Sequence, residues 1–182
     1  MDPLRNWIIV GRTDNPSTFY FTIGVDTDHH QIVIPNLIDN NVWQEFKIAM
    51  DFSGYTSIYK NNILVHQELM PVPLNIVRPI TWIGKSDYPE DDYLNADIDY
   101  LKIYNHHNDN IENEIAYYKF NQGSDGPNPT YLIDHSGNQN HGTINGATWQ
   151  ENIEGCIDEL ACNYNTENPA NIDDGSCEYS SC

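Results

Sequence analysis

The sequence predicts an all-β protein, an antiparallel β-sandwich followed by a small cysteine-rich tail. Between residues 7 and 104, β-branched and aromatic residues occur in short runs bounded by Asn, Asp, Gly or Pro, which is typical of strands separated by turns. No segment of useful length shows helical periodicity. All the cysteines lie in the final segment, from residue 156 onward, so the body must fold without disulfides.

Eight strands are expected in the body, at residues 6–10, 18–25, 31–34, 42–52, 57–60, 63–67, 80–84 and 96–104. In the fourth, Phe46, Ile48, Met50 and Phe52 alternate with polar or small residues, so these four should face a core. The Asn61-Asn62 pair accepts positive φ, which predicts a two-residue hairpin joining Tyr59 to Leu64.

The composition changes after Glu114 to loops rich in Gly, Asn, Asp and Pro around strand-like pieces at 115–120, 130–133 and 142–149. These pieces are interpreted as an edge hairpin added to the same sandwich. The domains are therefore expected at residues 1–150 for the sandwich and 151–182 for the cysteine-rich tail.

The chain is strongly acidic, with 27 Asp and Glu against 8 Lys and Arg and a formal charge of −19. Such a surface repels nucleic acid and anionic membranes. No stretch approaches the roughly 20 consecutive apolar residues of a membrane span, so membrane insertion is not expected. Clustered cysteines suit an oxidising exterior, which predicts an extracellular, cell-surface or virion-surface location.

Several motifs resemble a known family. The segment "YLNADIDYLKIYN" resembles the late strand of laminin-G-like, concanavalin A-like jelly rolls, and "VWQEFKIAMDFSGYTSIYKNNILV" is similar to that family's alternating strand, Asp-x-x-Gly turn and hairpin. The stretch "LIDHSGNQNHGTINGATW" resembles a segment that accompanies such domains in secreted proteins. The tail resembles a short cysteine repeat that follows them, with its Asp-Asp-Gly-Ser-Cys ending.

The resemblance implies a jelly roll of the lectin and glucanase type. The family's usual first strands have no counterpart upstream of "NWIIV". Either the chain is cut from a longer one or another segment fills the gap in the sheet, because an open apolar edge can pair with a second copy. Glycoside hydrolysis in this family requires paired acidic residues, and here Asp97 and Asp99 are followed by Leu101 where a third same-face acid would lie. Catalysis is therefore the least favoured interpretation.

Binding is better supported. The resemblance implies that loops at one rim hold a cation and an aromatic ring that stacks on sugar. The segment from Ser86 to Asn95 supplies the candidate ligand-binding residues Tyr88, Asp91, Asp92 and Tyr93, with further carboxylates at Asp26, Asp28 and Asp87. A solvated acidic rim without a ligand is an equally open interpretation.

Two segments carry oxygen ligands for calcium. The loop "DHSGNQN" offers Asp134, Asn138 and Asn140, although a plain Asx-turn is favoured there. Between the cysteines, oxygen side chains alternate before an Asp-Asp-Gly turn, as in loops that wrap a hard cation: Asn163, Asn165, Glu167, Asn171, Asp173 and Asp174. A disulfide knot with polar filling is the alternative for this stretch.

The cysteines are Cys156, Cys162, Cys177 and Cys182, separated by five, fourteen and four residues. Zinc sites usually pair cysteines two to four residues apart, so disulfides are favoured over zinc. Three connectivities are open, and Cys156 with Cys162 or Cys177 is preferred because a bridge across a longer loop stabilises more.

These features predict a non-catalytic recognition or adhesion module that binds glycans or surface proteins, with calcium as the cation. The alternative is a structural module of a fibre, surface layer or virion, in which the sandwich packs against copies of itself. A glycoside hydrolase is the third possibility.

Overall fold

A computed structural model of the chain describes residues 6–25, 28–76, 78, 81–85, 91–105, 114–121, 130–149, 153–167 and 169–179. Within these ranges the protein is all-β, as predicted, and contains no helix. None of the described segments is therefore a helix long and apolar enough to cross a membrane. The chain divides into two compact units, Met1–Asn95 with Tyr104–Asn113 and Ala96–Ile103 with Glu114–Cys182.

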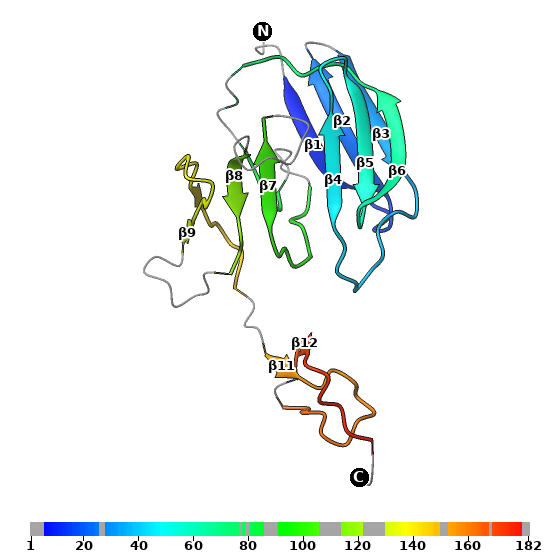
Figure 1. The fold of residues 1–182 in the computed structure, drawn as a ribbon, viewed down its shortest axis with the longest axis vertical. Helices are drawn as coiled ribbons and strands as arrows, with labels where there is room; N and C mark the ends of the chain where they lie inside the picture. The colour runs from blue at the N-terminus through cyan, green and yellow to red at the C-terminus, as the bar shows by residue number, and fades with distance from the viewer. Residues whose placement is uncertain are drawn as a thin grey trace. The chain divides into compact units, whose positions relative to one another are not determined.

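The first unit contains two three-stranded antiparallel sheets (Figure 1). One sheet has the order β1-β2-β3, formed by β1 (Trp7–Arg12), β2 (Phe19–Val25) and β3 (Asp28–Ile34). The other has the order β4-β5-β6, formed by β4 (Phe46–Met50), β5 (Tyr55–Lys60) and β6 (Ile63–Leu69). Both sheets are meanders, because each strand pairs with the next one along the chain.

A single core holds the two sheets together. Ile23 and Ile58 are fully buried, one from each sheet, and the rings of Phe19 and Phe46 stack with their centroids 5.2 Å apart. Burying a side chain of this size contributes about 1.5–3 kcal/mol. The remaining members are buried or partly buried apolar residues of both sheets and their connections: Phe21, Ile32, Leu37, Met70, Val25, Ile34, Ile38, Ile48 and Met50.

The predicted alternation in β4 is correct for Phe46, Ile48 and Met50 and wrong for Phe52, which is 83% exposed. The strand ends at Met50 because the next residues form a tight turn. The carboxylate of Asp51 accepts hydrogen bonds from the backbone N–H groups of Ser53 and Tyr55 at 2.8 and 3.0 Å. The period of two therefore stops before Phe52 can reach the core.

The predicted hairpin at Asn61-Asn62 is confirmed. Asn61 and Asn62 have φ of 49° and 64°, and Tyr59 pairs with Leu64. Two successive positive φ values give the turn a twist that matches the flanking strands.

Two other predicted strands are wrong in length or absent. Residues 81–84 form no strand, and the expected strand at 96–104 is limited to β7 (Leu101–Tyr104). Trp82 and Ile83 are 46% and 38% exposed, and residues 95–97 are exposed as well. Residues with a strand preference form strands when their side chains pack on a half-buried surface, and the side chains here are exposed instead.

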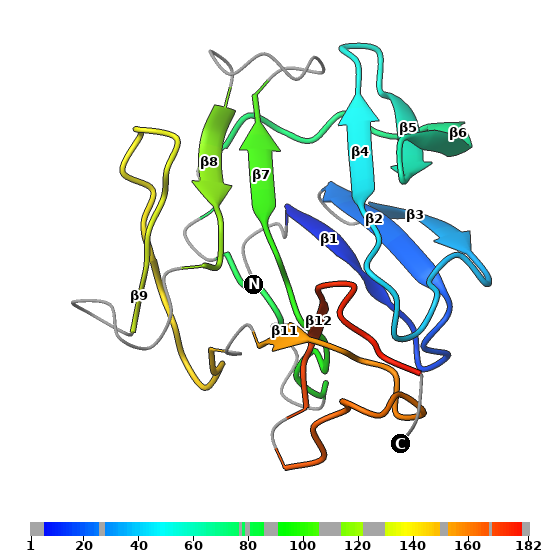
Figure 2. The ribbon, with the colours of Figure 1, turned by 60° about the horizontal axis from the view of Figure 1, so that its bottom comes forward.

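The second unit has its own core. In it β7 pairs with β8 (Glu114–Tyr118), and the short β9 (Tyr131–Leu132) pairs with β10 (Gly142–Thr143). Figure 2 shows β7 and β8 side by side and running in opposite directions. Their inner faces contribute to a cluster around three buried residues, Ala116, Tyr118 and Leu132, with Leu101, Ile103, Phe120, Ile144 and Trp149 packed against it.

This arrangement differs from the single sandwich with an edge hairpin that the sequence predicts, because the strands after residue 100 pair among themselves. The predicted boundary near residue 150 falls on residues 150–152, which lie outside the described ranges. In the tail, β11 (Glu154–Gly155) forms a short parallel pair with β12 (Ile172–Asp173).

Candidate functional site

An aromatic loop in the first unit contains the predicted ligand-binding residues. The backbone N–H of Leu94 donates to the carbonyl of Gly84 at 2.8 Å, which joins the segment 81–85 to the segment 91–94. Gly84 has a φ of 75°, the left-handed region that favours glycine. Next to this closure Tyr93 is 68% exposed, and the neighbouring Asp91 and Asp92 are also exposed.

The structure therefore brings Asp91, Asp92 and Tyr93 to one exposed segment. Tyr88, Asp87 and Asp26 lie outside the described residues, and Asp28 is an exposed residue at the start of β3. Three of the four predicted ligand-binding residues, Asp91, Asp92 and Tyr93, are thus among the described residues.

Trp82 is the aromatic residue of this loop that the sequence analysis misses. Its ring is 46% exposed, and the ammonium of Lys85 lies 4.7 Å from the ring centroid. Because a strand is predicted at 80–84, Trp82 is not among the candidate ligand-binding residues of the sequence. A Trp close to turn residues is the signal that could have identified it as exposed. An exposed ring beside carboxylates can stack on the apolar face of a sugar while the carboxylates accept hydrogen bonds from its hydroxyls.

The predicted calcium loop after β9 is instead organised around the buried side chain of Asp134. One carboxylate oxygen accepts from the backbone N–H groups of Tyr117 and Ser136, both at 2.9 Å. The other accepts from the Ser136 hydroxyl at 2.8 Å and from the backbone N–H of Asn140 at 2.9 Å. The bond between Asp134 and the N–H of Ser136 is the Asx-turn that the sequence favours.

These bonds set the charge state of Asp134. Burial opposes ionisation, but the N–H groups of Tyr117, Ser136 and Asn140 and the Ser136 hydroxyl outweigh it and lower the pKa of the carboxyl to about 2. Burial, and then the charge of Asp134, raises the pKa of the nearby Tyr118 hydroxyl, which donates to the carbonyl of Asn140. The loop is thus held by an ionised carboxylate at neutral pH.

The amides of Asn138 and Asn140 turn their nitrogens toward β8. Asn138 Nδ2 donates to the carbonyl of Glu114 at 2.8 Å, and Asn140 Nδ2 donates to the carbonyl of Ile115 at 2.6 Å. A calcium ion needs oxygen ligands, and four hydrogen-bond donors already occupy the carboxylate of Asp134. These hydrogen bonds fasten the loop to β8.

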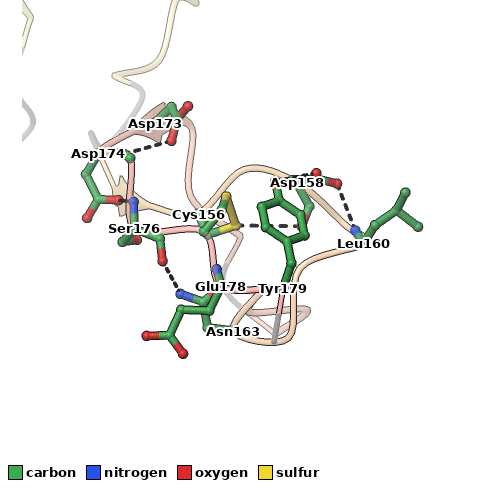
Figure 3. The surroundings of a disulfide bond; sticks show 11 residues. Cys156, Asp158, Leu160, Asn163, Asp173, Asp174, Ser176, Glu178 and Tyr179 are labelled. Carbon is green, nitrogen blue, oxygen red and sulfur yellow. Dashed lines mark hydrogen bonds between the residues drawn. A yellow bond between two sulfur atoms is a disulfide. The ribbon is translucent and has the colours of Figure 1, made fainter. Parts of the chain in front are cut away.

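The tail is stapled by a disulfide between Cys156 and Cys177, which is one of the two pairings preferred for Cys156 (Figure 3). Cys162 is also disulfide-bonded, and Cys182 lies outside the described residues. The bond between Cys156 and Cys177 closes a loop with a sequence separation of 21. Such a bridge contributes about 3 kcal/mol by restricting the unfolded chain.

Several of the oxygen side chains between the cysteines cap turns or join the ends of the loop. Asn163 donates from Nδ2 to the carbonyl of Ser176 at 2.7 Å and accepts at Oδ1 from the N–H of Glu178 at 3.0 Å, so it joins the two ends of the loop (Figure 3). Asn165 and Asp173 accept backbone N–H bonds from residues two positions later, Glu167 and Gly175 respectively.

Two further carboxylates follow the same rule. Asp174 accepts from the N–H of Ser176, and hydrogen bonds from Ser176 lower the pKa of Asp174. Asp158, which was not among the predicted ligands, accepts from the N–H of Leu160 at 2.9 Å and from the hydroxyl of Tyr179 at 2.7 Å (Figure 3). Asx-turns thus hold three of the predicted oxygen side chains, Asn165, Asp173 and Asp174.

One cavity of about 330 Å³ opens beside the disulfide, and several predicted ligands line it. Its oxygen-bearing side chains are Glu154, Asn163, Asn165, Asp174 and Ser176. Among the described residues no group of three His, Cys, Asp or Glu side chains is placed to hold a metal ion. The carboxylates that line the cavity are those of Glu154 and Asp174. The amides of Asn163 and Asn165 are already hydrogen-bonded within the tail.

Comparison with protein-family models, curated proteins and solved structures returned no match.

Proposed function

We propose that the chain is a non-catalytic extracellular recognition module with a concanavalin A-like jelly-roll fold. It binds carbohydrate through the aromatic loop of residues 81–85 and 91–94. The observation that carries the proposal is the exposure of Tyr93 beside Asp91 and Asp92 at a loop closed by the bond from Leu94 to Gly84. An aromatic ring exposed to water is unfavourable, and stacking on the apolar face of a sugar would remove the ring from water.

Two further features support this assignment. The two antiparallel sheets with one shared core provide a rigid base for a loop, as binding modules need. The disulfide of the tail is of the kind that persists in oxidising compartments, which is compatible with an extracellular location.

Calcium enters the proposal at Asp91 and Asp92, which are exposed and adjacent. Two carboxylates are fewer than the six to eight oxygen ligands that calcium takes, so the other ligands would be water, backbone carbonyls and sugar hydroxyls. The cation would then be bound firmly only together with the sugar.

A glycan array probed with the full chain, in calcium and in EDTA, tests the proposal. We expect reproducible binding that Tyr93→Ala reduces and EDTA weakens. Phe52→Ala is the matched control, because Phe52 is an aromatic residue of the same unit that is 83% exposed and lies outside the loop. The proposal fails if the array shows no binding, or if Tyr93→Ala and Phe52→Ala bind as the unmodified chain does.

A structural module is the second candidate, and the edge strand β6 favours it. Within the described part of the chain β6 is the last strand of its sheet, and Ile63 and Leu69 are 68% and 65% exposed. An exposed apolar edge is a template for pairing with a second copy. If this is the function, sedimentation will show concentration-dependent polymers that Val65→Pro abolishes, and no glycan will bind.

A further inference from the structure

Both lysines of the second unit lie near one tyrosine ring. The ammonium of Lys102 lies 4.4 Å from the centroid of the Tyr117 ring, and that of Lys119 lies 5.4 Å from the same centroid. Lys102 is also 5.9 Å from the ring centroid of Tyr100, and the ring of His135 meets the Tyr117 ring at 6.1 Å. We refer to Tyr100, Lys102, Tyr117, Lys119 and His135 as the tyrosine–lysine face.

The period of two in the strands builds this face. Leu101 and Ile103 of β7 pack against the core of the second unit, so Lys102 lies on the opposite side of the strand. In β8 the buried residues are Glu114, Ala116 and Tyr118, so the half-buried Tyr117 lies on the opposite side of the strand. Since β7 and β8 are neighbours (Figure 1), the outward residues of the two strands come together.

The charge of the face contrasts with that of its surroundings. Lys102 and Lys119 are the only Lys or Arg residues in the sequence ranges of the second unit, whereas Asp and Glu are frequent there. In the two strands, the outward residues are Lys102, Tyr104, Ile115 and Tyr117, with Lys119 directly after β8, and none of these is acidic. Both cations of the unit thus lie near the Tyr117 ring, and the acidic group that contacts Tyr117 is the buried carboxylate of Asp134 on its backbone N–H.

Two like charges near one ring are unfavourable unless something offsets their repulsion. The negative face of the Tyr117 ring attracts each ammonium and supplies part of the compensation. An anionic group that accepts hydrogen bonds from both ammonium groups would supply the rest, because charge-assisted hydrogen bonds are stronger than neutral ones. The exposed ring of Tyr100, 41% accessible, lies beside this position and provides an apolar surface.

We propose that the tyrosine–lysine face binds a uronate residue of an acidic saccharide, with the carboxylate between Lys102 and Lys119 and the sugar ring against Tyr100. This inference rests on the proposed function, because it names the class of glycan, and it places the anionic sugar apart from the aromatic loop. The net charge of −19 selects the source of the anion. Long-range repulsion from such a surface grows with the charge density of the ligand, so a densely sulfated polymer is repelled more than a saccharide with one carboxylate per sugar. The two ammonium groups act at short range, within the Debye length of about 8 Å.

The test measures binding of tetragalacturonate to the full chain by calorimetry, beside its methyl ester, a neutral tetrasaccharide and a sulfated tetrasaccharide. We expect the methyl ester to bind more weakly by about tenfold or more, since it lacks the charge that the ammonium groups recognise. Lys102→Ala and Lys119→Ala should each lose affinity for tetragalacturonate by a similar factor.

Two variants separate charge from folding and local packing. Lys102→Arg with Lys119→Arg retains both charges and should retain binding. Lys47→Ala is the matched control, because the Lys47 ammonium lies 5.7 Å from the Tyr59 ring centroid, a similar pair in the first unit. Equal binding of tetragalacturonate and its ester, preferential binding of the sulfated sugar, or unchanged binding in the two alanine variants would overturn the proposal.

The outcomes also separate this proposal from the function on which it rests. If neutral glycans bind through Tyr93 while tetragalacturonate does not bind, the aromatic loop stands and the tyrosine–lysine face fails. If tetragalacturonate binds through Lys102 and Lys119 while neutral glycans do not bind, the face stands and the aromatic loop fails.

Discussion

The indole ring of Trp7 covers Gly24 in the neighbouring strand. The two residues are direct cross-strand partners of β1 and β2, and a Cβ atom at position 24 would lie 2.5 Å from Trp7 Cε2. The ring also stacks against His29 of β3, with ring centroids 6.3 Å apart, so it spans the sheet. A glycine inside a strand is weak by itself, and the covering ring replaces the packing that a side chain would supply.

Gly24→Ala should therefore destabilise the first unit by about 1–3 kcal/mol, because the new methyl group displaces the Trp7 ring. The measurement is the free energy of unfolding in urea. The double variant Trp7→Ala with Gly24→Ala is the control, since it has no ring to displace. The two substitutions should be non-additive, and additive free energies would contradict the contact.

Gly54→Ala should be more damaging than other substitutions of turn glycines. Gly54 has a φ of 90°, and a Cβ atom there would lie 2.2 Å from the carbonyl oxygen of Met70, which is backbone and cannot rotate away. Gly84→Ala is the matched control in the same unit, with a φ of 75° and its nearest contact at 3.8 Å. We expect the backbone conformation alone to cost about 1–3 kcal/mol at Gly84 and the contact to add to this at Gly54. Equal free energies of unfolding would refute the clash.

Asp134→Asn should destabilise the second unit at neutral pH by about 1–3 kcal/mol, because an amide nitrogen replaces an oxygen that accepts two hydrogen bonds. The pKa of Asp134 is lowered to about 2 in the folded protein and lies near 3.9 in an unfolded chain. The stabilisation from ionised Asp134 is therefore complete above about pH 4 and is lost as the pH falls toward 2.

Hydrogen exchange of the amides in residues 114–121 and 130–145, measured from pH 7 down to pH 2, checks this prediction after correction for intrinsic rates. The difference between the unmodified chain and Asp134→Asn should shrink below pH 4. The exposed Glu159→Gln serves as the control for a simple loss of charge. A difference that is independent of pH would exclude the ionised carboxylate as its source.

Replacing Cys156 and Cys177 together by Ser should unfold the tail and leave the first unit unchanged. The connections that remain are the disulfide of Cys162, a few hydrogen bonds and a two-residue strand pair. We expect them to be too few to offset the entropy of the opened segment. Limited proteolysis should cut the variant between residues 157 and 176 while the melting temperature of the two-sheet unit stays the same. Protection of this segment in the variant would show that the remaining connections hold it.

Local patterns in the sequence predict the local features of this fold well. The Asn61-Asn62 hairpin, the Asx-turn at Asp134 and the apolar face of β4 each depend on residues within a few positions of one another. Phe52 marks the limit of such patterns. In the sequence Phe52 continues the apolar alternation of β4. The turn at Asp51 ends the strand before Phe52, and the Phe52 side chain is exposed to solvent.

Features that join distant segments could not be predicted in this way. The alternation of Lys102 and of Tyr117 is visible in the sequence, but the pairing of β7 with β8 is needed to place both lysines at one ring. In the same way, the bonds from the side-chain nitrogens of Asn138 and Asn140 to carbonyls of β8 join segments more than 20 residues apart.

By itself the sequence determined that this protein is all-β, that its body folds on apolar packing, and that its tail needs disulfides where apolar residues become scarce. These properties follow from composition and from short-range periodicity, which act on every conformation of the chain. Only the tertiary structure decided that Trp7 covers Gly24, that the strands after residue 100 form their own core, and that the two lysines of the second unit lie near one ring. Those contacts depend on which strands become neighbours, and burial of apolar surface across the whole chain selects that pairing.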